Sequence, residues 1–212
     1  MIKTCSILFL SICTSNILIA NEYTNNYTMG ISLDYQRIYS ESPKFIDINS
    51  NQDNIGGLSL ILGYRNLFDD YINNKKLSLN IEGRISKSFW EEDFAKSMRY
   101  SIFVKPQYNI YKSMNIYGLL GFGKLKIKGH NGHTPAHQNV IDKTIYNDTS
   151  FQWGIGINTN IYQHFSLFID YTSLTNNAKI DSTLYFYNPK VYKKLSSDSV
   201  NIGLNYKFNL NH

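Results

Sequence analysis

The feature that most constrains this chain is a set of short runs in which apolar and polar residues alternate. From Val200 to Phe208 every second side chain is apolar, with polar residues or glycine between them. Successive side chains of a strand point to opposite faces, so this pattern predicts a strand with one apolar face. Similar runs precede it at 30–36, 57–65, 77–86, 100–108, 116–127, 151–159 and 165–173.

Together these runs predict an all-β fold. Eight strands of roughly ten residues are the number and length found in the smallest membrane barrels. We therefore predict an eight-stranded antiparallel up-and-down transmembrane β-barrel, with a water-soluble sandwich or lipocalin-like barrel as the alternative. The longer connections, expected on the outer side of the membrane, are Ser40–Asn54, Ser88–Met98, Gly129–Asp148 and Ser173–Asp198.

The first residues predict export. Lys3 precedes an apolar stretch at 7–19, and Ala20 is a small residue at a suitable cleavage position. This is the layout of a secretory signal peptide, so we expect a signal peptide at 1–20 and one barrel domain at 21–212. Both cysteines, Cys5 and Cys13, lie in the removed segment, which leaves the barrel without a disulfide or thiol. An exported barrel is not expected to bind nucleic acid.

The polar faces of the runs carry charges of both signs. In a membrane barrel the apolar faces contact lipid and the polar faces fill the interior, which eight strands leave just wide enough for side chains. An unpaired charge there would be very costly, so we expect these charges to form pairs. The predicted polar network of the lumen consists of Asp34, Arg65, Glu82, Arg84, Lys105, Asp170 and Lys207.

Two hairpins and the end of the chain resemble a known family. The stretches VKPQYNIYKSMNIYGLLGFGKLKIKG and WGIGINTNIYQHFSLFIDYTSL are similar to hairpins of outer-membrane barrels of the OmpA, OmpX and Opa types. The resemblance implies a location in the bacterial outer membrane and a C-terminal signal, Tyr206 and Phe208, read by the barrel assembly machinery. That signal usually ends on the aromatic residue, whereas here 209–212 follow. The periplasmic domain of full OmpA proteins is expected to be absent.

Two groups of residues suggest chemistry but have simpler interpretations. His130, His133 and His137 could surround one metal ion, but nothing in the sequence supplies the rigid scaffold and supporting residues that such a site needs, so a polar surface loop is the preferred interpretation. The pair His164 and Ser166 resembles the His-x-Ser pair of lipid A deacylase barrels, but it falls at a periplasmic turn. We therefore predict no metal, no cofactor, no catalytic residue and no enzymatic activity.

The expected role is structural or adhesive and carried by the extracellular loops. The expected partners are outer-membrane lipid, lipopolysaccharide, the assembly machinery, and host or cell-surface ligands. Lys124, Lys126 and Lys128 share one strand face and suit anionic lipopolysaccharide. The alternative function is a narrow porin-like channel for ions or small solutes. Its sequence basis is a set of glycines on the predicted inner face, Gly57, Gly63, Gly154, Gly156 and Gly203.

Overall fold

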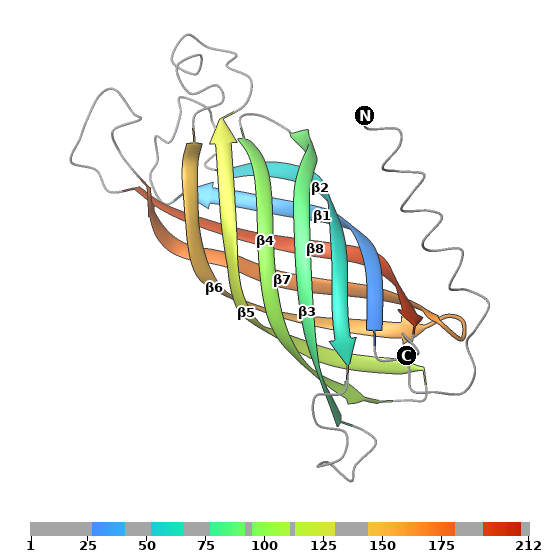
Figure 1. Cartoon of the computed structure of the whole chain (residues 1–212). Helices are drawn as coiled ribbons and strands as arrows, with labels where there is room; N and C mark the ends of the chain where they lie inside the picture. The colour runs from blue at the N-terminus through green and yellow to red at the C-terminus, as the bar shows by residue number, and fades with distance from the viewer. Residues whose placement is uncertain are drawn as a thin grey trace.

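The protein is a single closed β-barrel (Figure 1). The computed structural model describes residues 27–40, 52–65, 77–91, 95–110, 113–129, 144–180 and 193–208. The strands are β1 (Tyr27–Ser40), β2 (Gln52–Arg65), β3 (Leu77–Glu91), β4 (Ala95–Asn109), β5 (Met114–Gly129), β6 (Thr144–Asn160), β7 (Phe165–Ile180) and β8 (Lys193–Phe208). Among these residues, no helix is long and apolar enough to cross a membrane. The predicted signal peptide lies outside the described residues.

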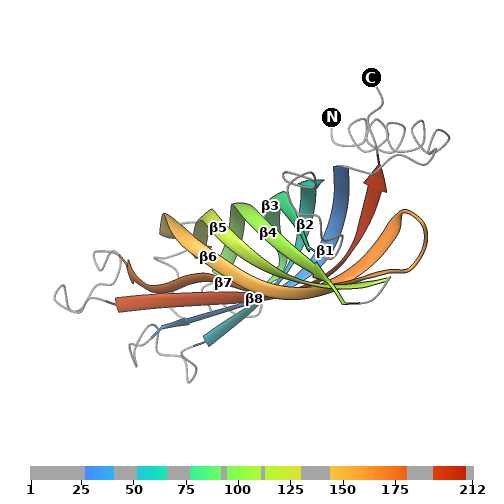
Figure 2. The ribbon, with the colours of Figure 1, turned by 90° about the horizontal axis from the view of Figure 1, so that it is seen from below.

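The last strand closes the barrel against the first. β1 and β8 pair antiparallel from Tyr27↔Phe208 to Ser40↔Leu195, and every other strand pairs with its neighbour in the sequence. The view in Figure 2 shows the strands wrapping around one interior. This confirms the predicted eight-stranded up-and-down barrel and excludes the sandwich alternative.

The strands run further toward the extracellular side than the sequence predicted. β3 continues to Glu91 and β4 begins at Ala95, so only residues 92–94 separate them, and the predicted loop Ser88–Met98 is wrong. In the same way, β6 begins at Thr144 and β7 continues to Ile180. Beyond the predicted limits the outward side chains include Lys87 and Lys96, which a strand tolerates once it is surrounded by water.

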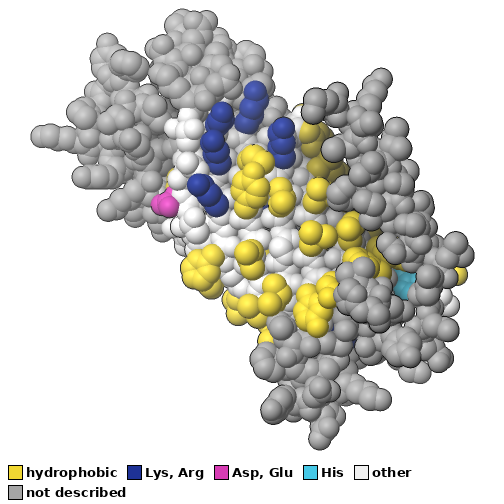
Figure 3. Space-filling model, viewed as in Figure 1, with side chains coloured by type: hydrophobic (Ala, Val, Ile, Leu, Met, Phe, Trp, Pro, Cys, Tyr) yellow, Lys and Arg dark blue, Asp and Glu magenta, His cyan; other side chains and the backbone are white. Residues whose placement is uncertain are grey.

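The outside of the barrel carries a broad apolar band. Ile102 is 68% exposed, Phe122 64% and Ile155 62%. A water-soluble protein does not expose a continuous belt of such side chains, whereas a lipid-facing surface requires one. Figure 3 shows these hydrophobic side chains below a group of basic ones. Outward aromatic residues mark the two levels at which the band ends: Tyr35, Tyr100, Trp153 and Tyr171 on the extracellular side, and Tyr64, Tyr108, Phe165 and Tyr206 on the periplasmic side.

Above the extracellular aromatic level the two faces of β5 exchange character. On β5, Leu120 and Phe122 point outward, but the next outward residues are lysines, and Leu125 and Ile127 point inward and are fully buried. Inward side chains from seven strands form one buried cluster here, which we call the apolar plug: Ile38, Ile55, Ala95, Leu125, Ile127, Tyr146, Leu174 and Leu195. This upper part therefore has the apolar interior of a protein surrounded by water.

The pairing of β6 with β7 is the shortest of the eight. It extends from Asn160↔Ser166 to Trp153↔Ser173 and stops near the extracellular aromatic level. Above that level, side chains join the two strands, because the Ser150 hydroxyl donates to the Leu174 carbonyl at 2.5 Å. The upper barrel is thus held by its apolar plug as well as by ladder hydrogen bonds.

Candidate functional site

The centre of the lumen is occupied by a buried ion network. Arg84 on β3 donates from Nε to Glu82 at 2.6 Å, and from Nη1 and Nη2 to the two oxygens of Asp170 at 3.0 and 2.6 Å. Lys105 on β4 donates to the other Glu82 oxygen at 2.7 Å. Two cations and two anions therefore balance in a buried site, which is the arrangement that makes buried charges tolerable. We call these four residues the central network.

Aromatic rings pack around this network and complete the filling of the lumen. The Arg84 guanidinium lies 5.6 Å from the ring centre of Phe103 and 5.7 Å from that of Phe168, so it is held between two cation–π contacts. The ammonium of Lys105 lies 3.9 Å from the ring centre of Tyr117. The Tyr117 hydroxyl also donates to Asp170 at 2.9 Å, which ties ring and network together.

A second polar layer lies between the central network and the apolar plug. Arg99 donates to Asp34 at 3.3 Å and to Ser86 at 2.8 Å. Ser59 bonds to both Asp34 and Ser86. Asn201 joins the layers, because its amide donates to Asp170 at 2.7 Å and its oxygen accepts from Arg99 at 3.5 Å. Side chains contributed by distant strands thus cross-link the interior from one wall to the other.

The inner glycines provide room for the rings that fill the lumen. A Cβ at Gly156 would lie 2.5 Å from the ring of Tyr117 and from the Cβ of Asp170. A Cβ at Gly203 would lie 2.7 Å from the ring of Phe168, and one at Gly154 would lie 3.2 Å from the side chain of Leu119. The space that the sequence associated with a channel is therefore taken by neighbouring side chains at these three positions.

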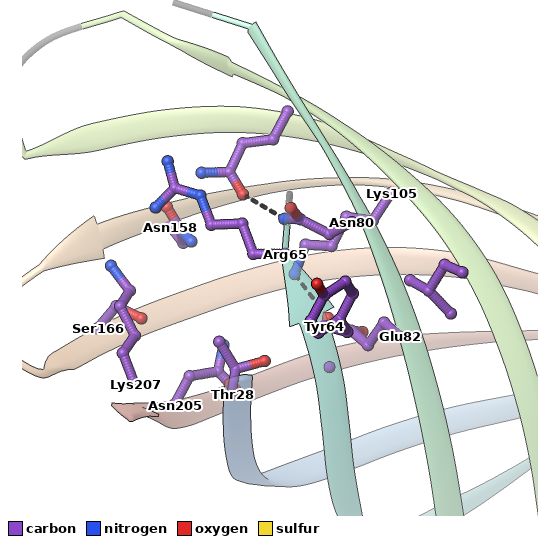
Figure 4. Close-up of a pocket in the computed structure, with 13 residues that line it drawn as sticks. Thr28, Tyr64, Arg65, Asn80, Glu82, Lys105, Asn158, Ser166, Asn205 and Lys207 are labelled. Carbon is purple, nitrogen blue, oxygen red and sulfur yellow. Dashed lines mark hydrogen bonds and ion pairs between the residues drawn. The ribbon is translucent and has the colours of Figure 1, made fainter. Parts of the chain in front are cut away.

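The periplasmic end of the lumen is different, because it holds a small cavity. The cavity has a volume of about 30 Å³ and lies at the strand ends (Figure 4). Arg65 and Lys207, which the sequence placed in the same network as Arg84, line this cavity instead. Lys105 and Glu82 form its inner wall. We call this space the periplasmic cavity.

The outward surface above the lipid carries a patch of lysines on β3, β4 and β5. We call it the lysine face; it consists of Lys87, Lys96, Lys124, Lys126 and Lys128. Lys96 is directly opposite Lys128, an arrangement in which like charges repel. Within the described part of the chain, no lysine of this patch has a salt bridge. Figure 3 shows basic side chains gathered above the apolar band.

On β1 and β8, the same extracellular level carries a neutralised pair instead. Arg37 lies two positions above Tyr35 and binds Asp198 through two hydrogen bonds of 2.9 Å. The hydrogen bond and charge of Asp198 raise the pKa of Arg37 further above its usual value. Tyr171 donates to the same carboxylate at 3.4 Å. Among the side chains that the structure describes, unpaired positive charge at this level thus lies on the β3–β5 side.

The structure bears on one of the two groups that suggested metal or hydrolytic chemistry. His130, His133 and His137 lie outside the described residues. Within the described part of the chain, no group of three or more metal-ligating side chains occurs. Ser166 is fully buried and points into the periplasmic cavity, whereas the His164 ring packs at 5.9 Å on the ring of Tyr206. The pair therefore lies at the periplasmic end, far from the outer leaflet.

Several interior residues were missed by the sequence reading. Arg99, Tyr117 and Asn201 each bind a predicted network member. Arg99 and Asn201 have the strand parity of Lys105 and Lys207, which were assigned inward, so extending the run of Lys105 by one position would have identified Arg99. Tyr117 lies on a run whose inner face the sequence did not indicate. The aromatic residues of the predicted C-terminal signal, Tyr206 and Phe208, stack at 6.2 Å, and their part in assembly stays a prediction.

A closed barrel with a charged interior and an apolar belt defines an integral protein of the bacterial outer membrane. The chain belongs to the family of the outer membrane protein beta-barrel domain, whose model matches residues 5–208. None of the curated proteins matches the sequence.

Two solved structures share the fold. The attachment invasion locus protein Ail of Yersinia pestis is 18% identical, with a TM-score of 0.55 over 87% of this chain and 100% of its own. Neisserial surface protein A is 12% identical, with a TM-score of 0.52 over 86% of this chain and 97% of its own. At these identities the likeness concerns the fold.

Proposed function

We propose that this protein is a non-conducting surface protein of the outer membrane with a structural or adhesive role on its extracellular side. The observation that carries the proposal is the filled lumen. The apolar plug, the layer around Arg99 and the central network follow one another along the barrel axis. A hydrated ion would have to break the Arg84 network and cross the dry plug, and both steps are costly.

A planar-bilayer recording tests this closure. Refolded protein should give no reproducible conductance steps, while heat-dependent electrophoretic mobility shows that the inserted material is folded. The double variant Leu125→Gly, Ile127→Gly removes two plug side chains and serves to show whether the plug contributes to closure. Stable steps from the unaltered protein would contradict the proposal and support the narrow channel.

The adhesive half of the proposal depends on the lysine face. Its five lysines stand above the lipid, and their mutual repulsion falls when a polyanion binds. The neighbour Ail was crystallised in complex with the heparin analogue sucrose octasulfate, in a structure 17% identical to this chain with a TM-score of 0.53. The partner that fits here is a saccharide bearing sulfate or phosphate groups, either lipopolysaccharide on the same cell or a sulfated glycan on a host surface.

Heparin chromatography of the refolded protein measures this interaction. The variant K124Q/K126Q/K128Q should elute at clearly lower salt than the unaltered protein, since three contacts with anionic groups are lost. The variant K124R/K126R/K128R keeps the charge and should elute as the unaltered protein does. Equal elution of all three proteins would end the adhesive proposal for this face. Repeating the comparison with lipopolysaccharide micelles distinguishes the two sources of anion.

The remaining partners follow from the fold. The apolar band requires outer-membrane lipid, and the stacked aromatic residues at the end of β8 fit recognition by the assembly machinery. Truncating the chain after Phe208 places the aromatic residue last, as in related signals. This variant should assemble at least as efficiently as the full chain, and Phe208→Ala should assemble less efficiently, as measured by the fraction of folded barrel in isolated outer membranes.

A further inference from the structure

The periplasmic cavity has an excess of positive charge. Three cationic side chains line it, Arg65, Lys105 and Lys207, against one carboxylate, Glu82, which leaves a net charge of +2. Glu82 is already committed to Arg84 and Lys105. Within the described residues, neither Arg65 nor Lys207 has a carboxylate partner. The unbalanced charge therefore belongs to these two side chains.

Several polar atoms of the cavity wall are buried without a hydrogen-bond partner. They include Nε of Arg65, the hydroxyl of Ser166, and the side-chain oxygens of Asn80 and Asn205. Ser166 is completely buried and Asn205 is 5% exposed. A buried polar group without a partner costs about 1–3 kcal/mol. Two of these groups can donate, Arg65 Nε and the Ser166 hydroxyl, and the two amide oxygens accept, so together they favour a polar molecule that carries both acceptor oxygens and a hydroxyl, as protonated phosphate does.

The side chains come from strands far apart in the sequence and face one space. Arg65 ends β2, whereas Ser166 begins β7 opposite Asn205 of β8, and Lys207 follows two positions later. Figure 4 shows Arg65 extending toward Asn158, with Ser166 and Lys207 on the other side of the cavity. Lys207 uses one of its three donors on Asn160, which leaves two for a ligand. Donors are thus available from more than one direction.

The net charge and the hydrogen-bond donors of the periplasmic cavity indicate which kind of ligand fits it. A metal cation is disfavoured by the net charge of +2, and one neutral water leaves that charge unbalanced. The cavity volume of about 30 Å³ holds some two waters, so a tetrahedral anion fits with part of its surface toward the strand ends. Guanidinium, ammonium and hydroxyl donors around such a space are typical of phosphate sites.

We propose that the periplasmic cavity binds a phosphate group through Arg65, Lys207 and Ser166. The phosphate belongs either to free inorganic phosphate or to a phospholipid headgroup of the periplasmic leaflet, because the strand ends border both. This site is independent of the lysine face, which lies at the opposite end of the barrel. The inference therefore stands or falls separately from the proposed adhesive role.

Calorimetric titration of the refolded full chain tests the site. The protein is prepared in an uncharged maltoside detergent without phosphate and titrated with inorganic phosphate. We expect one site per barrel and a Kd that rises about tenfold or more in Arg65→Gln and in Lys207→Gln, since each variant removes a charge-assisted hydrogen bond. Ser166→Ala should raise the Kd less, because it removes a neutral donor.

Arg37→Gln is the matched control, since it removes one positive charge at the opposite end of the barrel and lies outside both proposed binding surfaces. It should bind phosphate as the unaltered protein does, and heat-dependent mobility shows that every variant is folded. Tighter binding of glycerol 1-phosphate than of phosphate would assign the site to a lipid headgroup, and equal or weaker binding to the free ion. Absence of binding for both ligands, or an unchanged Kd in Arg65→Gln and Lys207→Gln, would overturn the proposal.

Discussion

The membrane-embedded part of this barrel and its extracellular extension are built from the same strands with opposite distributions of polarity. Between the two aromatic levels, Arg84 and Asp170 are inside and Ile102 is outside. Above the upper level, Leu125 is inside and Lys124 is outside. Between β4 and β5 the register runs through this boundary without a shift, so the same alternation of faces continues on both sides of it.

This difference shows that the surroundings, and not the fold, determine which face of a strand is apolar. Lipid offers no hydrogen-bond partners, so charged side chains in that zone are placed in the lumen and paired there. Water surrounds the extension, so burial of apolar side chains inside becomes favourable and charges move outside. A single closed sheet therefore has a lower part organised like a membrane protein and an upper part organised like a water-soluble protein.

The largest effect is expected from the interior of the embedded part. Arg84→Leu leaves Glu82 with Lys105 alone and takes from Asp170 its only cationic partner among the described residues. We expect the free energy of unfolding to fall by about 3–5 kcal/mol. Urea unfolding in lipid vesicles, followed by tryptophan fluorescence, measures it. A loss below about 1 kcal/mol would show that the central network is not the tightly coupled unit described here.

The interior of the extension should respond as an ordinary protein core does. Leu125 is fully buried in the apolar plug, so Leu125→Ala removes apolar contacts and leaves a cavity. The free energy of unfolding should fall by about 3 kcal/mol. Lys124→Gln, one position away and pointing outward, is the matched control and should change the free energy by about 0.5 kcal/mol or less. Equal effects of the two changes would mean that the plug is not packed.

The outer surface gives a test of where the lipid ends. Leu120 points outward within the apolar band, four positions before Lys124 on the same strand. Leu120→Lys should cost about 2–4 kcal/mol, because a charge is placed against hydrocarbon. Thr149→Lys, on β6 opposite Lys124, should cost much less. Vesicle unfolding experiments on both variants therefore locate the boundary, and similar costs would place Thr149 inside the bilayer.

Much of this architecture could be predicted from the sequence, because alternation reports the face of each side chain. The eight runs predicted the eight strands and the order in which they pair. Glu82, Arg84 and Asp170 were assigned to the inner face and lie there in one network. A period of two is a local property, so a single chain without relatives is enough to read it.

The other features of the structure could not be predicted from the local sequence pattern. The contact between Arg84 and Asp170 joins residues 86 positions apart and exists only because the sheet closes. Arg65 and Lys207 share the inner parity but lie at the strand ends, where the sequence gives no depth along the axis. The strand limits near Ser88 were misjudged because consecutive polar residues, Ser86, Lys87 and Ser88, are as compatible with a loop as with a strand in water.

The smallest expected effect on the free energy of unfolding comes from the packing of the lumen. Gly156→Ala places a methyl group 2.5 Å from the Tyr117 ring and from the Cβ of Asp170, and both side chains are held by their mutual hydrogen bond. We expect a loss of about 1–3 kcal/mol from overpacking. Gly83→Ala is the matched control, since its Cβ would meet nothing closer than 3.9 Å. Alanine also restricts the unfolded chain, so this change should be neutral or slightly stabilising. Urea unfolding of the two variants in lipid vesicles measures both changes in the free energy of unfolding. If Gly156→Ala left this free energy unchanged, the ring of Tyr117 would have free space beside it, and that result would support the narrow channel.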